Sequence, residues 1–491
     1  MPRTDDLEGI DLLREALDRA DYHVDRIRAT LDLKGPFSRD PHDAPVYLRL
    51  LPDDAFGTLA RLFLLGQPVD GDLARAALAP LELERLKRMD VVVPHERGVE
   101  STIDLLPWNG LRIAADPVLS DLPPTREDYV IGVHPPTVML AELTPRRQYD
   151  ATLDLGTGSG VHALLTAGHA RRAVGTDVNA RAVEFARFNA RLNAIANAEF
   201  YEGDLFDPVD EERFDLIVCN PPYVISPEAA YAFRDGGGRA DAFCEDLVRR
   251  SAAHLAEGGL AILLVGWVHG RDEPWSAPLR RWVEGSGCDT IVLHTASQDP
   301  LSYAASWNKA LRWDRVAYDS AIERWLEYDR SLGIEAIAWG AVVLRRRVGE
   351  NWFAGHSVGL GRLDAAGHHV ERMVDTHDYL EQVGEGESFL GARVALAPDH
   401  RIDQTLAAEN GGHVVERAAL RLAGGFNFEL ELNETALDLV ARLDGRPLAD
   451  VLRAMSEDAS DAARRELVDT ALPMVRALLA LGFAVPAEEA R

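Results

Sequence analysis

Residues 215–223 read Asp-Leu-Ile-Val-Cys-Asn-Pro-Pro-Tyr, and they carry the strongest structural signal in the chain. The apolar, β-branched run Leu216–Val218 predicts a buried strand. Pro221 and Pro222 cannot continue a central strand, so the chain has to turn at the strand's carboxyl end. Ligands bind at that end in an open α/β sheet. We therefore expect the residues of this turn to lie at a ligand site.

The turn itself indicates what kind of group is bound there. The amide oxygen of Asn220 and the carbonyl of Pro221 are two acceptors, which together match the two hydrogens of a planar –NH2 group. Tyr223 offers an aromatic face on which such a group stacks. We predict that Asn220, Pro221, Pro222 and Tyr223 form the catalytic turn and hold a planar amide or amino nitrogen.

Bulk composition narrows the class of protein. The 491 residues predict two to four domains, and 80 acidic against 52 basic residues give a formal net charge of −28. This excess argues against a protein that coats nucleic acid non-specifically. The three cysteines form neither a zinc pattern nor a disulfide framework, so we expect no metal and a reducing cytoplasm. No apolar stretch approaches the ~18–20 residues that span a bilayer, and no membrane association is expected.

The chain divides into three predicted parts. Residues 1–120 are mostly helical, with a winged-helix pattern from about 56 to 113. Residues 121–350 alternate strands and helices, which predicts a parallel, doubly wound sheet and a Rossmann-like α/β core. Residues 351–491 form a C-terminal domain with a second winged-helix-like pattern.

The expected elements follow the hydrophobic pattern. In the central part we expect strands at 152–155, 173–177, 199–201, 216–219, 261–265 and 338–344, and helices from 161, at 180–192 and at 247–256, with further helices and several aromatics over 270–335. In the last part we expect a strand at 428–432, helices from Asn433 to 443, at 448–455 and at 462–481, and a short apolar tail at 483–485.

A glycine-rich turn follows the first of these strands. Gly156, Gly158 and Gly160, with Thr157 between them, let the backbone approach a ligand closely. The spacing is GxGxG and lacks the pyrophosphate-binding GxGxxG pattern of dinucleotide sites. Asp154 ends the strand with a carboxylate that suits an ammonium group. Together these features favour S-adenosylmethionine (SAM) over a dinucleotide.

Two further acids end successive strands. Asp177 lies 21 residues after Gly156, where a carboxylate accepts both ribose hydroxyls. Asp204 follows the third strand and is expected to accept the adenine amino group, with Val178 and Leu205 on the two faces of the ring. Taken alone, each of these acids is as often a structural cap or turn residue as a ligand-binding residue. Three of them at successive strand ends, beside the glycine turn and Asn-Pro-Pro-Tyr, predict one cofactor-binding site, to which Asn220 also belongs.

Three other reactive residues lie near the predicted site. Cys219 is expected to be a small buried strand residue and not a nucleophile. For His134 and His162 we favour packing or hydrogen bonding over catalysis.

With these motifs, residues 150–270 resemble the class I SAM-dependent methyltransferases of the small-domain group. This group includes release-factor glutamine methyltransferases and ribosomal-RNA guanine N2 methyltransferases. The residues that carry the resemblance are Asp154–Gly160, Asp177, Asn189, Asp204 and Asn220–Tyr223. It implies a SAM cofactor and methyl transfer to a planar nitrogen. The layout, with extra N- and C-terminal units, is similar to that of actinobacterial methyltransferases.

Two details qualify the resemblance. Gly132-Val133-His134-Pro135-Pro136-Thr137 is similar to the segment that packs over the cofactor in these families. It departs from the Pro-Arg-Pro-Glu-Thr-Glu of the release-factor enzymes, which counts against a release-factor substrate. The segment 432–485 also resembles a small peptide-binding chaperone fold of peptide-modification pathways.

Three hypotheses for function remain open on the sequence. The preferred one is an N-methyltransferase acting on a protein glutamine side chain. The second is a nucleic-acid methyltransferase (rRNA, tRNA or DNA) acting on adenine N6, guanine N2 or cytosine N4, which needs a flipped or single-stranded base. The third is a non-catalytic SAM-binding adaptor, against which the intact motifs argue.

Overall fold

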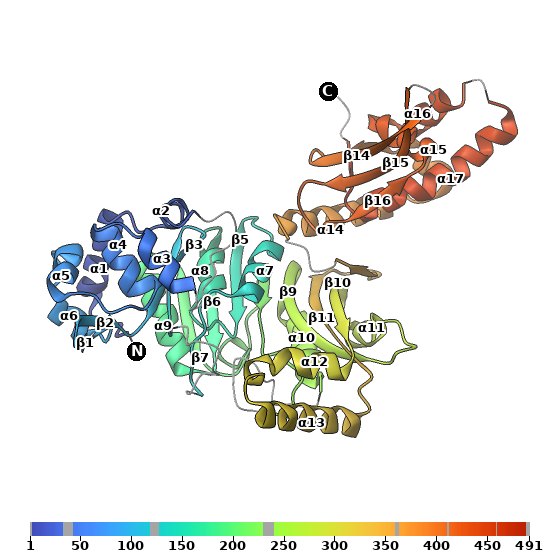
Figure 1. Ribbon diagram of the computed structural model, residues 1–491. Helices are drawn as coiled ribbons and strands as arrows, with labels where there is room; N and C mark the ends of the chain where they lie inside the picture. Colours follow the sequence, from blue (N-terminus) through green and yellow to red (C-terminus); the bar gives the residue numbers. More distant parts are fainter. Residues whose placement is uncertain are drawn as a thin grey trace. The chain divides into compact units, whose positions relative to one another are not determined.

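A computed structural model of the chain describes residues 2–32, 43–117, 127–228, 240–358, 363–409, 412–457 and 459–487 (Figure 1). The chain forms two compact units. The first contains residues 1–141 and 147–357, and the second contains residues 142–146 and 358–491. The division of the chain into three domains remains a prediction.

The first unit is built on an eight-stranded sheet. Its strands are β5 (Tyr149–Leu155), β6 (Ala170–Asp177), β7 (Ala198–Glu202), β8 (Phe214–Cys219), β9 (Leu255–His269), β10 (Cys288–Gln298), β11 (Ala336–Arg346) and β12 (Phe353–Ser357). Their order is β12-β10-β11-β9-β8-β5-β6-β7. The α/β, Rossmann-like class of the core is confirmed. The expectation of an all-parallel sheet is wrong, because β11 runs antiparallel to both β9 and β10.

Helices cover both faces of this sheet. The helices of this part are α7 (Pro135–Leu143), α8 (Val161–Ala167), α9 (Ala180–Leu192), α10 (Ala242–His254) and α11 (Ala277–Val283). Alternate strand residues such as Leu153, Leu155 and Ile217 pack in one cluster with residues of α10 and α11. Residues of α8 and α9 form a different cluster with Phe200 of β7. These two apolar layers fix the strand ends on which the predicted site lies.

The N-terminal part packs on α9 in the same unit (Figure 1). Its elements are α1 (Leu7–Arg19), α2 (Val24–Thr30), α3 (Ala44–Leu50), α4 (Ala55–Leu59), η2 (Ala60–Leu64), α5 (Gly71–Leu78), α6 (Leu83–Arg88), β1 (Val92–His95), β2 (Gly98–Ser101), β3 (Asp104–Trp108) and β4 (Leu111–Ala115). Phe185 and Phe188 of α9 are fully buried in the core that these helices form. The winged-helix assignment stays a prediction.

A helical insertion separates β10 from β11. It consists of α12 (Pro300–Trp307), η4 (Lys309–Leu311) and α13 (Arg315–Leu332). Asp299 begins α12 by accepting the N–H of Ser302, and Gly333 ends α13 in the left-handed conformation (φ 66°). Because β10 and β9 both run antiparallel to β11, β10 ends at the same edge of the sheet as β9 and β8. The insertion therefore leaves the sheet at the edge where Asn220 follows β8.

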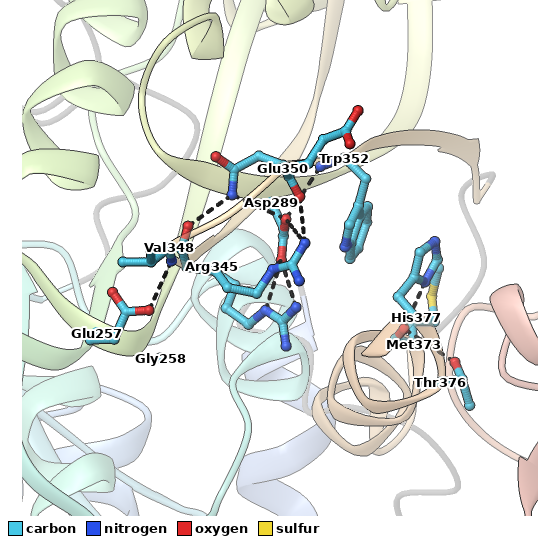
Figure 2. A network of polar contacts seen from close by, with 12 residues as sticks. Glu257, Gly258, Asp289, Arg345, Val348, Glu350, Trp352, Met373, Thr376 and His377 are labelled. Carbon is cyan, nitrogen blue, oxygen red and sulfur yellow. Dashed lines mark hydrogen bonds and ion pairs between the residues drawn. The ribbon is translucent and has the colours of Figure 1, made fainter. Parts of the chain in front are cut away.

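A buried carboxylate holds the other end of β10 (Figure 2). Asp289 is 1% exposed and accepts hydrogen bonds from Nε and Nη2 of Arg345 at 3.0 and 2.6 Å. It also pairs with Nε of Arg347 at 2.9 Å and accepts the N–H of Trp352 at 3.2 Å. These contacts fix the turn that leads from β11 into the edge strand β12. Two cations and a backbone donor offset the cost of burying this charge.

The second unit contains two three-stranded sheets and four helices within its described residues. Its elements are α14 (Ala366–Val383), η5 (Gly386–Gly391), β13 (Arg393–Leu396), β14 (His400–Glu409), β15 (Gly412–Leu422), β16 (Glu429–Leu432), α15 (Glu434–Ala441), β17 (Asp444–Pro447), α16 (Leu448–Met455), α17 (Asp461–Ala480) and β18 (Ala484–Pro486). The sheets are β14-β15-β16 and β17-β13-β18. Asn433 caps α15 by accepting the N–H of Ala436. Throughout the described ranges, every helix is too short or too polar to cross a bilayer.

Candidate functional site

Asp154 lies at the carboxyl end of β5 and organises the glycine turn. It is 1% exposed, and its Oδ2 accepts Oγ1–H of Thr157 at 2.7 Å and the N–H of Ala163 at 3.0 Å. Its Oδ1 is buried and has no hydrogen-bond partner among the described residues. Burial raises the pKa of Asp154 to about 7. An unpaired carboxylate oxygen of this kind is suited to receive a cationic donor.

The glycine turn exposes backbone to a ligand. Gly156 and Gly158 have φ of 63° and 54°, and a Cβ added at either would meet no other described atom closer than 4.0 Å. Gly160 has a different role, because a Cβ there would lie 2.9 Å from Cβ of Ala186 on α9. The first two glycines thus leave room beside the backbone for a ligand. The third allows α8 and α9 to pack closely.

Asp177 ties the glycine turn to the end of β6. Its Oδ2 accepts the N–H of Gly158 at 2.8 Å, and its Oδ1 accepts the N–H of Asn179 at 2.9 Å. Burial raises the pKa of Asp177 above its usual range, although both backbone donors act against this shift. Each carboxylate oxygen retains acceptor capacity beyond its single backbone contact.

The turn after β7 lies directly beside Asp177. The N–H of Gly203 donates to the carbonyl of Asp177 at 3.0 Å, and Oγ1 of Thr176 donates to the carbonyl of Leu205 at 2.7 Å. Asp204 is exposed at this turn and Leu205 is half-buried, with φ of 47°. Val178 is 64% exposed. All four predicted adenine and ribose residues thus occupy one edge of the sheet, and their roles remain predictions.

The Asn-Pro-Pro-Tyr turn follows β8 at the same edge. Sγ of Cys219 lies 3.2 Å from the carbonyl of Leu155, which brings the end of β8 beside the glycine turn. Asn220 is half-buried, and its side chain forms no hydrogen bond with any part of the chain that the structure describes. Its amide is therefore available to a ligand.

Tyr223 is fixed through its backbone. A Cβ on Gly266 of β9 would lie 2.5 Å from the carbonyl oxygen of Tyr223, so only glycine allows this approach. The ring is half-buried and packs against the core of the sheet. Burial raises the pKa of Tyr223 to about 12, so the phenol is neutral at physiological pH. The side chain can offer an aromatic face but no charge.

The neighbouring histidines and cysteine are not charged. Burial lowers the pKa of His162 to about 3, and neither of its ring nitrogens has a partner among the described residues. Nδ1 of His134 lies 2.6 Å from Oγ1 of Thr137 and 3.2 Å from the carbonyl of Gly132, and burial lowers its pKa as well. Burial raises the pKa of Cys219 well above that of a free thiol. These states favour the packing interpretation of all three residues.

Asn189 is a buried connector that links the glycine turn to the N-terminal part. Its Nδ2 donates to the carbonyls of Ser159 and Ala114 at 2.8 and 2.9 Å, and its Oδ1 accepts the N–H of Ala114 at 2.8 Å. The side chain therefore satisfies one backbone group of the turn and two of β4.

The sequence did not identify the residues of the helical insertion that contact the chain after the catalytic turn. The hydroxyl of Tyr303 on α12 accepts the N–H of Ile225 at 3.2 Å, two residues after Tyr223. On α13, the hydroxyl of Tyr328 accepts the N–H of Ala240 at 3.1 Å, and Arg324 pairs with Glu228 at 3.2 Å. The aromatic-rich composition of residues 270–335 was the only signal of this region in the sequence.

Comparison with known proteins agrees with this geometry. Residues 132–272 match the family described as "Methyltransferase small domain". Residues 19–102 and 371–486 match two families described as domains of unknown function (DUF7059 and DUF7782). The central part of the chain is a class I SAM-dependent methyltransferase domain of the small-domain group, and its cofactor is SAM.

The relatives described here match less than a third of this chain. The chain is 44% identical over 90 residues to the release factor glutamine methyltransferase of Aliivibrio fischeri, which covers 18% of this chain and 31% of that protein. It is 37% identical over 130 residues to the enzyme of the same name from Xylella fastidiosa, covering 24% and 47%. The chain thus spans about a third to a half of the length of these relatives.

Among solved structures, one that aligns with part of this chain is the SAM-dependent methyltransferase from Thiobacillus denitrificans in complex with S-adenosyl-L-homocysteine. It aligns with 44% of this chain and 94% of its own at 18% identity and a TM-score of 0.26.

The residues of this chain fit the cofactor. Oδ1 of Asp154 is an unpaired acceptor that would suit the ammonium of the methionine end, and the turn at Gly156 and Gly158 leaves space for a close backbone contact. Asp177 retains acceptor capacity for hydroxyl groups. Nowhere in the described ranges do three or more His, Cys, Asp or Glu side chains gather as a metal site would require.

Proposed function

We propose that the protein is an N-methyltransferase that transfers a methyl group from SAM to the side-chain nitrogen of a protein glutamine. One observation carries the proposal. The amide of Asn220 makes no hydrogen bond with the described chain, although it stands at the strand end beside the cofactor turn. The two relatives named above are both release factor glutamine methyltransferases, which supports a glutamine acceptor.

The mechanism rests on how the catalytic turn holds the acceptor. When bound, SAM supplies an electrophilic methyl group on its sulfonium. Asn220 Oδ1 and the carbonyl of Pro221 accept the two N–H groups of the acceptor amide and return electron density to its nitrogen. Tyr223 stacks on the amide plane and directs the nitrogen lone pair toward the cofactor. Alignment is the main contribution, followed by stabilisation of the charge that develops on nitrogen.

No general base is needed before the transfer. The acceptor nitrogen keeps both hydrogens, held by Asn220 and Pro221, until the new bond has formed. The product is then cationic and loses a proton readily. This order agrees with the states of Tyr223 and His162. The phenol of Tyr223 stays protonated at pH 7, and the neutral imidazole of His162, with a pKa of about 3, is too weak a base to take up the proton.

Labelling with tritiated SAM tests the acceptor class. The purified protein is incubated with a cell lysate, and the labelled species are digested with protease or with nuclease. A protein acceptor predicts label that survives nuclease and is lost to protease, and mass spectrometry then maps the methylated glutamine. The Asn220→Ala variant serves as the inactive control.

Two results contradict the proposal. Label that survives protease but not nuclease identifies a nucleic-acid acceptor, the second hypothesis from the sequence. SAM binding without transfer to any macromolecule supports the adaptor hypothesis.

A further inference from the structure

The tip of the helical insertion carries an unusual concentration of exposed apolar surface. Trp307, Trp313 and Val316 are 37%, 81% and 77% exposed. They lie within ten residues, at the end of α12 and the start of α13. Exposed aromatic and aliphatic side chains that gather in this way mark interaction sites in soluble proteins.

The same ten residues are basic in an acidic chain. Lys309, Arg312 and Arg315 against Asp314 give residues 307–316 a net charge of +2, whereas the whole chain carries −28. Asp314 is engaged as the cap of α13, where it accepts the N–H of Ala317 at 3.0 Å. The guanidinium of Arg312 lies 4.7 Å from the ring centroid of Trp313. We name Trp307, Lys309, Arg312, Trp313 and Val316 the insertion tip.

One residue of the insertion tip, Trp307, is connected through Tyr303 to the segment after the catalytic turn. The ring centroids of Trp307 and Tyr303 are 6.1 Å apart. The hydroxyl of Tyr303 accepts the N–H of Ile225 at 3.2 Å, two residues beyond Tyr223. These contacts connect Trp307, at the end of α12, through Tyr303 to the segment that directly follows Tyr223.

We propose that the insertion tip is the docking surface for the acceptor protein. This proposal rests on the proposed function and adds a chemistry for the partner: an apolar contact for Trp313 and Val316, bordered by acidic side chains for Lys309 and Arg312. Trp and Arg are the residues that most often dominate the energy of a protein interface. Charge complementarity raises the association rate and disfavours other partners.

The composition of the tip favours a protein over RNA. Single-stranded nucleic acid binds to grooves in which aromatic rings alternate with cations, and bases gain little from an aliphatic residue such as Val316. The net charge of −28 repels a polyanion at long range. A short acidic segment of a protein carries far less charge than a nucleic acid.

The test compares two acceptors in the same enzyme. One is the intact acceptor protein whose labelled glutamine has been mapped, and the other is a short synthetic peptide around that glutamine. Trp313→Ala and Arg312→Glu are the test variants, and Leu73→Ala, an exposed aliphatic residue (53%) on α5, is the matched control. Because Trp313 and Arg312 are exposed, neither change is expected to affect folding.

We expect kcat/KM for the intact protein to fall about tenfold or more in both test variants. In these variants the rate with the peptide and the Kd for SAM should stay at the wild-type value. In Leu73→Ala, kcat/KM for the protein, the rate with the peptide and the Kd for SAM should all stay at the wild-type value. Equal kcat/KM for the intact protein in wild type and Trp313→Ala overturns the docking proposal, and so does an equal loss with protein and peptide. If ribonuclease treatment of the acceptor abolishes the difference between variants, the tip binds RNA and the proposal is wrong.

Failure of the proposed function has a different signature. In that case the wild-type enzyme labels no protein glutamine, and the docking proposal falls with the proposed function. Failure of the docking proposal alone leaves labelling of the protein intact and removes only the difference between variants.

Discussion

The backbone N–H of Gly158 donates a hydrogen bond to Oδ2 of Asp177 at 2.8 Å, so a residue at the end of β6 fixes the conformation of the turn that follows β5. The carboxylate thus positions the glycine turn and is also the predicted acceptor for the cofactor ribose. Asn220, by contrast, makes no hydrogen bond within the described chain. The two residues are therefore expected to affect different steps.

Asp177→Ala should weaken SAM binding about 10- to 100-fold, because hydrogen bonds to a charged group contribute about 1.5–3 kcal/mol. Asn220→Ala should leave the Kd for SAM within about twofold and lower kcat about 100-fold, since it removes an interaction with the reacting group. Calorimetric titration with SAM and single-turnover rates measure the two effects separately. Wild-type turnover in Asn220→Ala would refute its assignment to the acceptor nitrogen.

SAM binding should depend on pH through Asp154. Its pKa in the protein without ligand is raised to about 7 by burial, and only the ionised carboxylate attracts an ammonium group. With respect to this group, the affinity for SAM should therefore level off above about pH 8. It should fall by up to about tenfold per unit as the pH falls from 7 to 5.5. Calorimetric titrations with SAM at pH 7, in buffers of different ionisation enthalpy, should detect the proton that Asp154 releases when SAM binds.

Asp154→Asn provides the control for this pH dependence. The variant should bind SAM more weakly at pH 7.5, and its affinity should no longer change between pH 7 and 5.5. A slope that persists in the variant would assign the titration to another group.

Sequence reasoning worked where the pattern is local. The helix predicted at 180–192 has these same bounds in the structure, because its apolar spacing is regular and Asn179 caps its start by accepting the N–H of Arg181. The strand β10 was missed, since Thr290, His294 and Ser297 interrupt its apolar run. Its presence between helices depends on pairing with β11 and β12, which is not local information.

In the candidate site, too, the sequence predicted features that depend on local patterns and missed contacts between distant residues. The acids and glycines at strand ends were predicted because each lies at or within a few residues of the end of an expected strand. The contact between Tyr303 and Ile225 joins residues 78 positions apart, and neither residue belongs to a motif. Only the fold brings the insertion to the catalytic turn.

The buried carboxyl of Asp329 should reduce stability in a pH-dependent way. Asp329 on α13 is 2% exposed, its Oδ2 has no partner in the described chain, and burial raises its pKa from 3.8 to about 6. The folded state therefore binds a proton more tightly than the unfolded state. The cost of ionising the folded carboxyl is fully present above pH 6 and disappears as the pH falls toward 3.8.

Asp329→Asn should accordingly raise the thermal midpoint of the first unit at pH 8 and change it less at pH 5. The gain in the free energy of unfolding at pH 8 is at most about 3 kcal/mol, the equivalent of the pKa shift. Scanning calorimetry at both pH values measures the difference. Asp319→Asn, an exposed acid on the same helix, is the control and should show no such dependence. An equal effect of Asp329→Asn at pH 8 and pH 5 would show that the carboxyl is not destabilised by its ionisation.

Gly266→Ala tests whether the backbone position of Tyr223 matters for transfer. The new Cβ would lie 2.5 Å from the carbonyl oxygen of Tyr223, and because Gly266 pairs with Trp339 in the sheet, the catalytic turn has to move. Overpacking of this kind costs about 1–3 kcal/mol. We expect kcat to fall about tenfold or more while the Kd for SAM stays near the wild-type value, since the cofactor residues lie on β5, β6 and the turn after β7.

Gly391→Ala is the matched control, because a Cβ there would meet no described atom within 4 Å. Unchanged kcat in a folded Gly266→Ala variant would show that transfer tolerates displacement of Tyr223, which would argue against stacking of its ring on the acceptor.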